Sequence, residues 1–159
     1  MVTLTKIGWV FKMTTTLKEW LILNEYSLDD LNSVGKYGNS ALMKACREAN
    51  IQIVDELLAL GVDLNIKNVD GNSALWNACF GNSYECFEAL VKAGIDIDSQ
   101  NVNNVTSLMY CASAGKEDFV ELLLKYKART DFESLDGFKA IDLAVTSKIV
   151  KLLKNATLS

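Results

Sequence analysis

The chain has 159 residues, of which half are apolar, so it can bury the core of one domain and is not expected to be disordered. Its net charge of −4, without any run of Lys or Arg, excludes nucleic acid as an expected partner. It contains no histidine, which excludes His-dependent nucleophiles and the commonest neutral zinc ligand. We therefore expect no catalytic, metal or cofactor site.

The first thirteen residues are apolar but are interrupted by Lys6 and Lys12, and no small-residue cleavage site follows them. We expect neither a secretion signal nor a membrane span. The cysteines lie within apolar stretches without C-x-x-C spacing and are typical of small buried residues in a reducing compartment. They are Cys46, Cys79, Cys86 and Cys111. A cytoplasmic location is expected.

The first predicted unit covers about residues 4–33. Thr16 and Glu19 have the spacing of a capping box ahead of the apolar Trp20, Leu21 and Leu23. Its repeat pattern is degenerate, and we interpret this unit as a cap over one open end of the core.

The next unit begins with a turn and a short helix, which Ser40 can cap and which runs to Arg47. Asn50 can cap a second helix, in which apolar residues recur at spacings of three and four. Gly61 then supplies a left-handed exit. The segment 38–42, Gly-Asn-Ser-Ala-Leu, returns unchanged at 71–75, and looser copies follow at 104–108 and 137–141. A fixed interval of 33 residues predicts a repeat protein.

The later units vary this order of turn, short helix, second helix and left-handed exit. Asn82 and Glu85 have capping-box spacing, whereas Asn104 and Lys127 stand where glycine is expected at a left-handed turn. Asn tolerates a positive φ, but Lys does so at a cost of about 1 kcal/mol, so we expect a slightly altered turn near Lys127. The pairs Asp70-Gly71 and Asp136-Gly137 predict projecting β-turn fingers between units. The last unit has lost roughly three residues between its helices, and the tail after Leu153 is expected to fray.

These residues resemble the ankyrin repeat over about residues 14–154. The segments Gly71-x-Ser73-Ala74-Leu75-x-x-Ala78-Cys79 and Leu57-Leu58-x-x-Gly61-Val62-Asp63-Leu64-Asn65 fit its motif. The family's proline and histidine are absent, and Met43, Trp76 and Met109 stand in three of the histidine positions. The resemblance implies an all-α repeat solenoid of stacked helix-turn-helix units with projecting fingers. The expected division is a degenerate cap at 1–33, repeats at 34–68, 69–101 and 102–134, and a truncated cap at 135–159.

In this family, partners contact the fingers and the exposed face of the first helices, which together form a concave groove. The corresponding finger residues are Lys36, Tyr37, Asn39, Val69, Asp70, Asn72, Val102, Asn103, Val105, Leu135, Asp136 and Phe138. On the helix face they are Lys44, Arg47, Trp76, Asn77, Phe80, Tyr110 and Ser113. Aromatic and Arg anchors among neutral polar groups are typical of protein-binding hot spots.

We therefore expect a small intracellular adaptor or stoichiometric inhibitor that binds a protein partner and is a monomer when free. One alternative is a self-assembling structural element that uses the apolar segment with Ile7, Trp9, Val10 and Phe11. A further alternative is an enzyme, which would need a deep pocket with converging ionisable groups. Trp76 could face the groove or bridge to the next unit.

Overall fold

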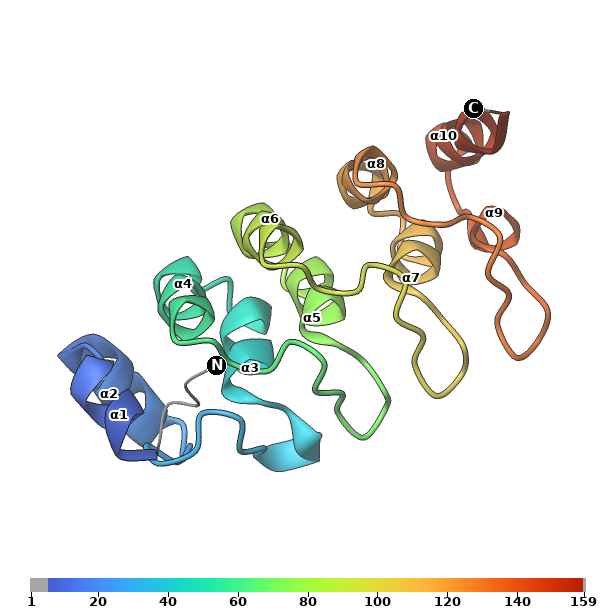
Figure 1. The fold of residues 1–159 in the computed structure, drawn as a ribbon. Coiled ribbons are helices and arrows are strands. Elements are labelled where there is room, and N and C mark those ends of the chain that lie inside the picture. The colour runs from blue at the N-terminus through green and yellow to red at the C-terminus, as the bar shows by residue number, and fades with distance from the viewer. Residues whose placement is uncertain (1–5, 159) are drawn as a thin grey trace.

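The computed structural model describes residues 6–158; residues 1–5 and 159, and the side chains of Lys6, Ile7 and Trp9, lie outside that description. The fold is an all-α stack of helix pairs, as the repeats predict. Its helices are α1 (Lys6–Lys12), α2 (Thr15–Leu23), α3 (Ala41–Arg47), α4 (Ile51–Ala59), α5 (Ala74–Phe80), α6 (Tyr84–Lys92), α7 (Ser107–Ser113), α8 (Glu117–Lys125), α9 (Ala140–Leu143) and α10 (Ser147–Leu158), with a 3₁₀ turn, η1, at Lys36–Gly38. Figure 1 shows an inner row of α3, α5, α7 and α9, an outer row of α4, α6, α8 and α10, and long loops projecting beside the inner row.

The helices begin at side-chain caps. Ser40 Oγ accepts a hydrogen bond from Met43 N at 3.2 Å, and Asn50 Oδ1 accepts one from Ile53 N at 3.3 Å. Each bond satisfies one of the amide groups that a helix start leaves without a partner. The predictions that Ser40 and Asn50 cap α3 and α4 are confirmed.

Two predicted capping boxes are wrong. Asn82 adopts a left-handed backbone with φ 55°, and the neighbouring Ser83 caps α6 through a 3.2 Å bond from Cys86 N. In α2 the cap is Thr14, which accepts from Leu17 N at 3.2 Å, rather than Thr16. Both errors come from adjacent residues with similar side chains, among which the spacing rule cannot choose.

The outer helices α4, α6 and α8 end in the same way. Gly61, Gly94 and Lys127 have φ values of 77°, 92° and 68°. The left-handed exits predicted at Gly61 and Gly94 are confirmed, whereas the expectation of an altered turn near Lys127 is wrong, because the lysine adopts the same left-handed backbone as the glycines. The following amide then donates back to a carbonyl in the last turn, as Ala128 N does to Leu123 O at 2.9 Å. This turn brings Val62, Ile95 and Ala128 into the core with at most 7% of their surface exposed.

The core runs along the stack between the two rows. All four cysteines are free and buried, in agreement with the sequence prediction. Close approach of α5 to α3 depends on Gly81, because a Cβ there would overlap the carbonyl oxygen of Arg47. The N-terminal helices join the stack through Thr14, whose backbone N and Oγ1 donate to the Glu56 carboxylate at 2.6 and 2.7 Å.

The fingers are turns that hydrogen-bond to one another. In the second finger Gly71 N donates to Asn68 O at 2.9 Å, and the one β-bridge in the described residues, Val34 with Ser40, belongs to the first finger. Neighbouring fingers are joined by Val69 N to Tyr37 O at 3.0 Å, and two further such bonds follow along the stack. The fingers therefore form a continuous ribbon edge beside the inner helices.

The last unit is shortened between its helices, and α9 has four residues where α3, α5 and α7 have seven. The prediction that the tail frays after Leu153 is wrong, because α10 continues as a helix to Leu158. The Thr157 hydroxyl donates to Leu153 O at 2.8 Å, which adds a side-chain bond to the last turn.

Candidate partner-binding groove

Side chains from three consecutive inner helices stack across the groove face. The Arg47 guanidinium lies 4.1 Å from the centre of the Phe80 ring. The Phe80 and Tyr110 rings are 6.5 Å apart, and Trp76 stacks on Tyr110 at 4.3 Å. We call Arg47, Trp76, Phe80 and Tyr110 the aromatic ladder. It joins α3, α5 and α7 through cation–π and ring-stacking contacts, which are worth about 0.5–1.5 kcal/mol each at partly exposed sites.

The repeat places these groups. Arg47 and Phe80 are the last residues of α3 and α5, one repeat of 33 residues apart, and Gly81 lets those helix ends approach closely. Trp76 lies one turn before Phe80 on the same face of α5. Phe80 keeps 45% of its surface exposed, whereas Trp76 and Tyr110 are half-buried. Trp76 therefore bridges to the next unit, one of the two roles expected for it, and its side chain stays partly exposed.

A hollow of about 570 Å³ opens at the N-terminal end of the ladder. Its lining includes three cationic side chains, Lys36, Lys44 and Arg47, against one carboxylate, Glu25. Lys44 is paired with Glu48 at 3.0 Å, but both side chains are about 40% exposed, so this ion pair is readily exchanged. The hollow is consequently a weakly cationic site beside an aromatic surface.

Two tyrosine hydroxyls near the groove are kept protonated by their surroundings. Burial raises the pKa of Tyr110, and the charge of a Cys111 thiolate would raise it further. Burial also raises the pKa of Tyr26, with a contribution from Glu48, and the Tyr26 hydroxyl donates to Asn39 O at 3.1 Å. Near neutral pH both hydroxyls are therefore protonated and uncharged, and the Tyr26 hydroxyl is a hydrogen-bond donor.

The finger tips form a second exposed row. Val69, Val102 and Leu135, at the same position of successive fingers, expose 65%, 60% and 65% of their surface. Tyr37 and Phe138 are also exposed, at 63% and 48%. Asp70, Asn103 and Asp136 are exposed polar groups beside them, and Lys36 lies 4.9 Å from the Tyr37 ring. The predicted finger residues thus present apolar side chains to solvent beside the groove.

Some expected contact residues are used inside the protein. Asn77 is only 2% exposed, and its Nδ2 donates to Ser73 O at 3.0 Å, so it supports α5 instead of presenting its side chain on the open face. Asn39 and Asn72 are half-buried and accept hydrogen bonds from side chains of the next finger, at 3.0 and 3.1 Å. Val105 is half-buried at the base of its finger. On the helix face Ser113 is exposed, and its hydroxyl donates to Tyr110 O at 2.8 Å.

Part of the hollow was missed by the sequence argument. Leu23, Asn24, Glu25 and Tyr26 line it from the end of α2 and the turn that follows. These residues belong to the degenerate first unit, where the repeat supplies no counterpart from which to infer a contact. An isolated aromatic residue at the turn, Tyr26, was the available signal.

Within residues 6–158, side chains of three or more cysteines and carboxylates nowhere come together in a way that could hold a metal ion. The described helices also include none long and apolar enough to cross a membrane. The Cys79 thiol is hydrogen-bonded to Cys111, and this bond, together with burial, raises its pKa well above the ordinary value of 9.0. Low-pKa thiolates are the reactive form of cysteine, so Cys79 is a packing residue.

Fold and site together define a helical-repeat protein: stacked helix pairs, a ribbon of fingers and an open groove, the arrangement of a binding module. A family model of three ankyrin repeats matches residues 11–101, more than half of the chain. The chain belongs to the ankyrin-repeat family, whose members generally bind other proteins and are typically not catalytic. Comparison with curated proteins gives no match.

Proposed function

We propose that the chain is a small adaptor or stoichiometric inhibitor that holds a folded protein partner in the groove between its inner helices and its fingers. The observation that carries the proposal is the aromatic ladder, where the Arg47 guanidinium lies over the Phe80 ring at 4.1 Å and both side chains remain exposed. Rigid aromatic side chains lose little conformational entropy on binding, and aromatic and Arg side chains dominate the energy of protein interfaces.

The charges suggest how a partner is oriented. Lys36, Lys44 and Arg47 surround the hollow at one end of the groove, whereas Asp70 and Asp136 stand on fingers further along. A partner segment with an acidic side chain at the hollow and apolar side chains on Trp76 and Phe80 matches this arrangement. Complementary charge chiefly sets orientation and association rate, while the buried aromatic contacts supply affinity.

The partner is expected in a reducing compartment, and we propose the cytoplasm. The support is that all four cysteines are free thiols in the core, although Cys46 and Cys86, and likewise Cys79 and Cys111, are hydrogen-bonded neighbours. Disulfides form and persist in oxidising compartments. This part of the proposal is tested by locating the tagged chain in fractionated cells.

The test is capture of partners from native extract by the wild type and by a Trp76→Ala, Phe80→Ala double variant. Loss of a single hot-spot side chain costs about 2 kcal/mol or more, so retention should fall by roughly thirtyfold. Circular dichroism first checks that the variant is folded, because Trp76 also stacks on Tyr110.

A matched control is Tyr84→Ala. Tyr84 is as exposed as Phe80, at 46% against 45%, but it lies on α6 in the outer row. A partner lost from the double variant and kept by Tyr84→Ala supports the groove. Equal retention by all three chains contradicts it and relocates the partner to another face.

Self-assembly remains the second candidate, because the N-terminal helices carry an exposed apolar set. Phe11, Ile22 and Leu23 expose 84%, 62% and 82% of their surface on α1 and α2. Our proposal expects a monomer when free. Sedimentation velocity over a hundredfold range of concentration decides between them, since a mass that rises with concentration and falls back in Phe11→Ser supports self-assembly.

A further inference from the structure

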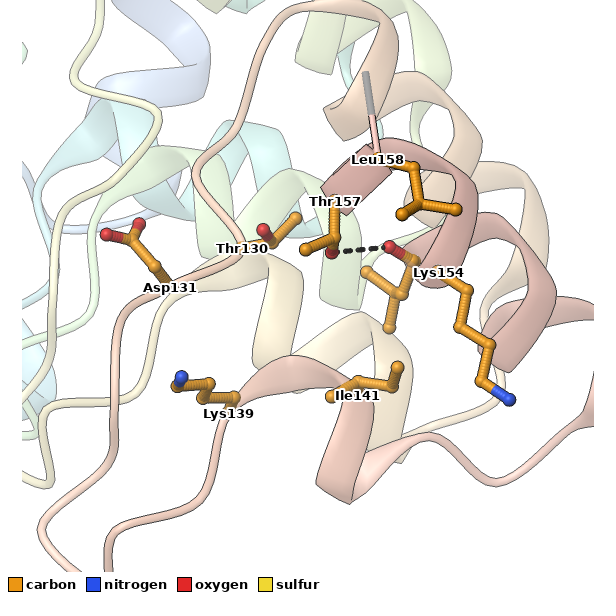
Figure 2. Close-up of a pocket in the computed structure, with 8 residues that line it drawn as sticks. Thr130, Asp131, Lys139, Ile141, Lys154, Thr157 and Leu158 are labelled. Carbon is orange, nitrogen blue, oxygen red and sulfur yellow. Dashed lines mark hydrogen bonds between the residues drawn. The ribbon is translucent and has the colours of Figure 1, made fainter.

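A second apolar pocket lies at the C-terminal end of the stack, away from the groove. Figure 2 shows it between the loop before the last finger, α9 and α10, with Ile141 at its base, Leu158 above it, and Lys139 and Lys154 at its rim. Its volume is about 480 Å³. Internal repetition shows what fills the same place elsewhere in the molecule.

In three earlier units this place is closed by the chain itself. After α4, α6 and α8 the left-handed turn carries one aliphatic residue, Val62, Ile95 or Ala128, into the core. The leucines at the repeat position of Ile141 are buried in those units: Leu42, Leu75 and Leu108 are 2%, 0% and 1% exposed. Ile141 at the same position is only half-buried.

The last unit lacks this closure because α10 does not turn. Counting from the buried Leu123 and Leu153, Thr157 corresponds to Lys127 and Leu158 to Ala128. Thr157 is still helical and bonds to Leu153 O, the carbonyl that corresponds to the acceptor of Ala128 N. Leu158 is therefore 87% exposed, whereas Ala128 is 7% exposed.

The rim of the pocket also carries a hydrogen-bond acceptor, the Asp131 carboxylate. In earlier units the amide just after the aliphatic residue can donate to a side chain 31 residues back: Asp63 N to Asn32 Oδ1 at 2.8 Å, and Arg129 N to Asp98 Oδ1 at 2.9 Å. The next residue in that series is Asp131, which lines the pocket. Its carboxylate accepts hydrogen bonds from the Arg129 guanidinium at 2.6 and 2.9 Å, and because these side chains are 58% and 59% exposed, the pair costs little to rearrange.

We propose that this end pocket binds an extended segment of a partner protein that carries an aliphatic residue followed by an acidic one. The aliphatic side chain packs on Ile141 and Leu153, and the next backbone N–H donates to Asp131. The acidic residue faces Lys139 and Lys154, as Asp63 and Asp96 follow Val62 and Ile95 in the earlier units. The site is separate from the groove and does not depend on the function proposed for it.

The probe is a synthetic peptide with the sequence of residues 93–100, Ala-Gly-Ile-Asp-Ile-Asp-Ser-Gln, titrated into the isotope-labelled chain. We expect saturable NMR shifts at the Ile141 and Leu153 methyl groups at millimolar peptide. A peptide with Asp in place of the first Ile should bind at least about tenfold more weakly, since it cannot bury the aliphatic side chain.

Substitutions in the chain test the acceptor. Asp131→Asn keeps an oxygen at the place where earlier units have Asn32 and Asn65, and should bind like the wild type. Asp131→Ala should weaken binding about three- to tenfold, as expected for one hydrogen bond. Asp131 is exposed, so neither change threatens folding. Trp76→Ala, a groove variant, should leave the titration unchanged and so separates the two proposals.

Several results would overturn the end pocket as a partner site. Equal shifts with the control peptide, no shifts at millimolar peptide, or shifts confined to α5 would each do so. A chain whose mass rises with concentration, and whose association is lost in Leu158→Asp, would show instead that a second copy fills the pocket.

Discussion

Gly81→Ala tests whether the groove depends on close contact between α3 and α5. The backbone of Gly81 has φ −77°, which alanine adopts without strain, so the effect must come from space. A Cβ there would overlap the Arg47 carbonyl oxygen and lie 2.9 Å from its carbon, closer than real Cβ atoms come to their neighbours. The obstacle is backbone and cannot rotate away, so α3 and α5 must separate by roughly one ångström.

Overpacking costs typically about 1–3 kcal/mol, and a rigid backbone obstacle places this substitution near the upper end. For a chain of this size, about 3 kcal/mol lowers the melting temperature by roughly 6–12 °C. The same displacement moves Phe80 from Arg47, so partner binding should weaken as well. The cost belongs to one interface between neighbouring units, as the nearest-neighbour energetics of repeat stacks require.

The control is Gly94→Ala, in which the added Cβ has free space and the cost comes from the backbone conformation. Gly94 has φ 92° and nothing within 4 Å of an added Cβ, so alanine meets only backbone strain of about 1–2 kcal/mol. Both variants are compared with the wild type by calorimetry and urea unfolding. A Gly81→Ala chain that melts at the same temperature as the Gly94→Ala chain, or above it, would refute the claim that helix contact at Gly81 holds these units together.

The remaining predictions concern the fingers and the thiols. Gly71→Ala should cost about 2 kcal/mol more than Gly137→Ala in urea unfolding, because only Gly71 would place a Cβ 2.7 Å from a backbone nitrogen of the next finger; equal losses would contradict a packed ribbon of fingers. Folding raises the pKa of Cys79 above 9.0, chiefly through its bond to Cys111, so the folded state holds this proton more tightly. The contribution of Cys79 to stability should be complete below pH 9 and fall above it by up to about 1.4 kcal/mol per pH unit, and Cys79→Ala, which reproduces Ala112 of the next unit, should reduce the slope of stability against pH in that range.

The sequence predicted those features that depend on a single unit. The caps at Ser40 and Asn50 and the left-handed exit at Gly61 follow from local chemistry, and all three are present. An altered turn was expected near Lys127, but its position in the repeat outweighs the preference of its side chain, and the turn stays left-handed. The failed caps at Asn82 and Thr16 show the limit of local rules where neighbouring side chains compete.

Features that arise between units could not be predicted in the same way. The stacking of Trp76 on Tyr110 joins residues at different positions of successive repeats, so it depends on how far one helix is displaced from the next. Bonds such as Val69 N to Tyr37 O depend on the same displacement. The burial of Asn77 was missed because a polar residue on the inner row was assumed to face solvent.

The places where units agree and the places where they differ have separate physical meanings. Buried positions repeat nearly the same residue, as Cys46 and Cys79 do, because each unit must fit the same neighbours. Arg47, Phe80 and Ser113 occupy one position of the groove face, yet they differ, and the first two are complementary: a guanidinium lies over a ring. If packing between units were the only requirement at this position, the same residue could stand in all three units. We therefore expect that partner binding, and not packing between units, is the reason why residues at this exposed position depart from the repeat.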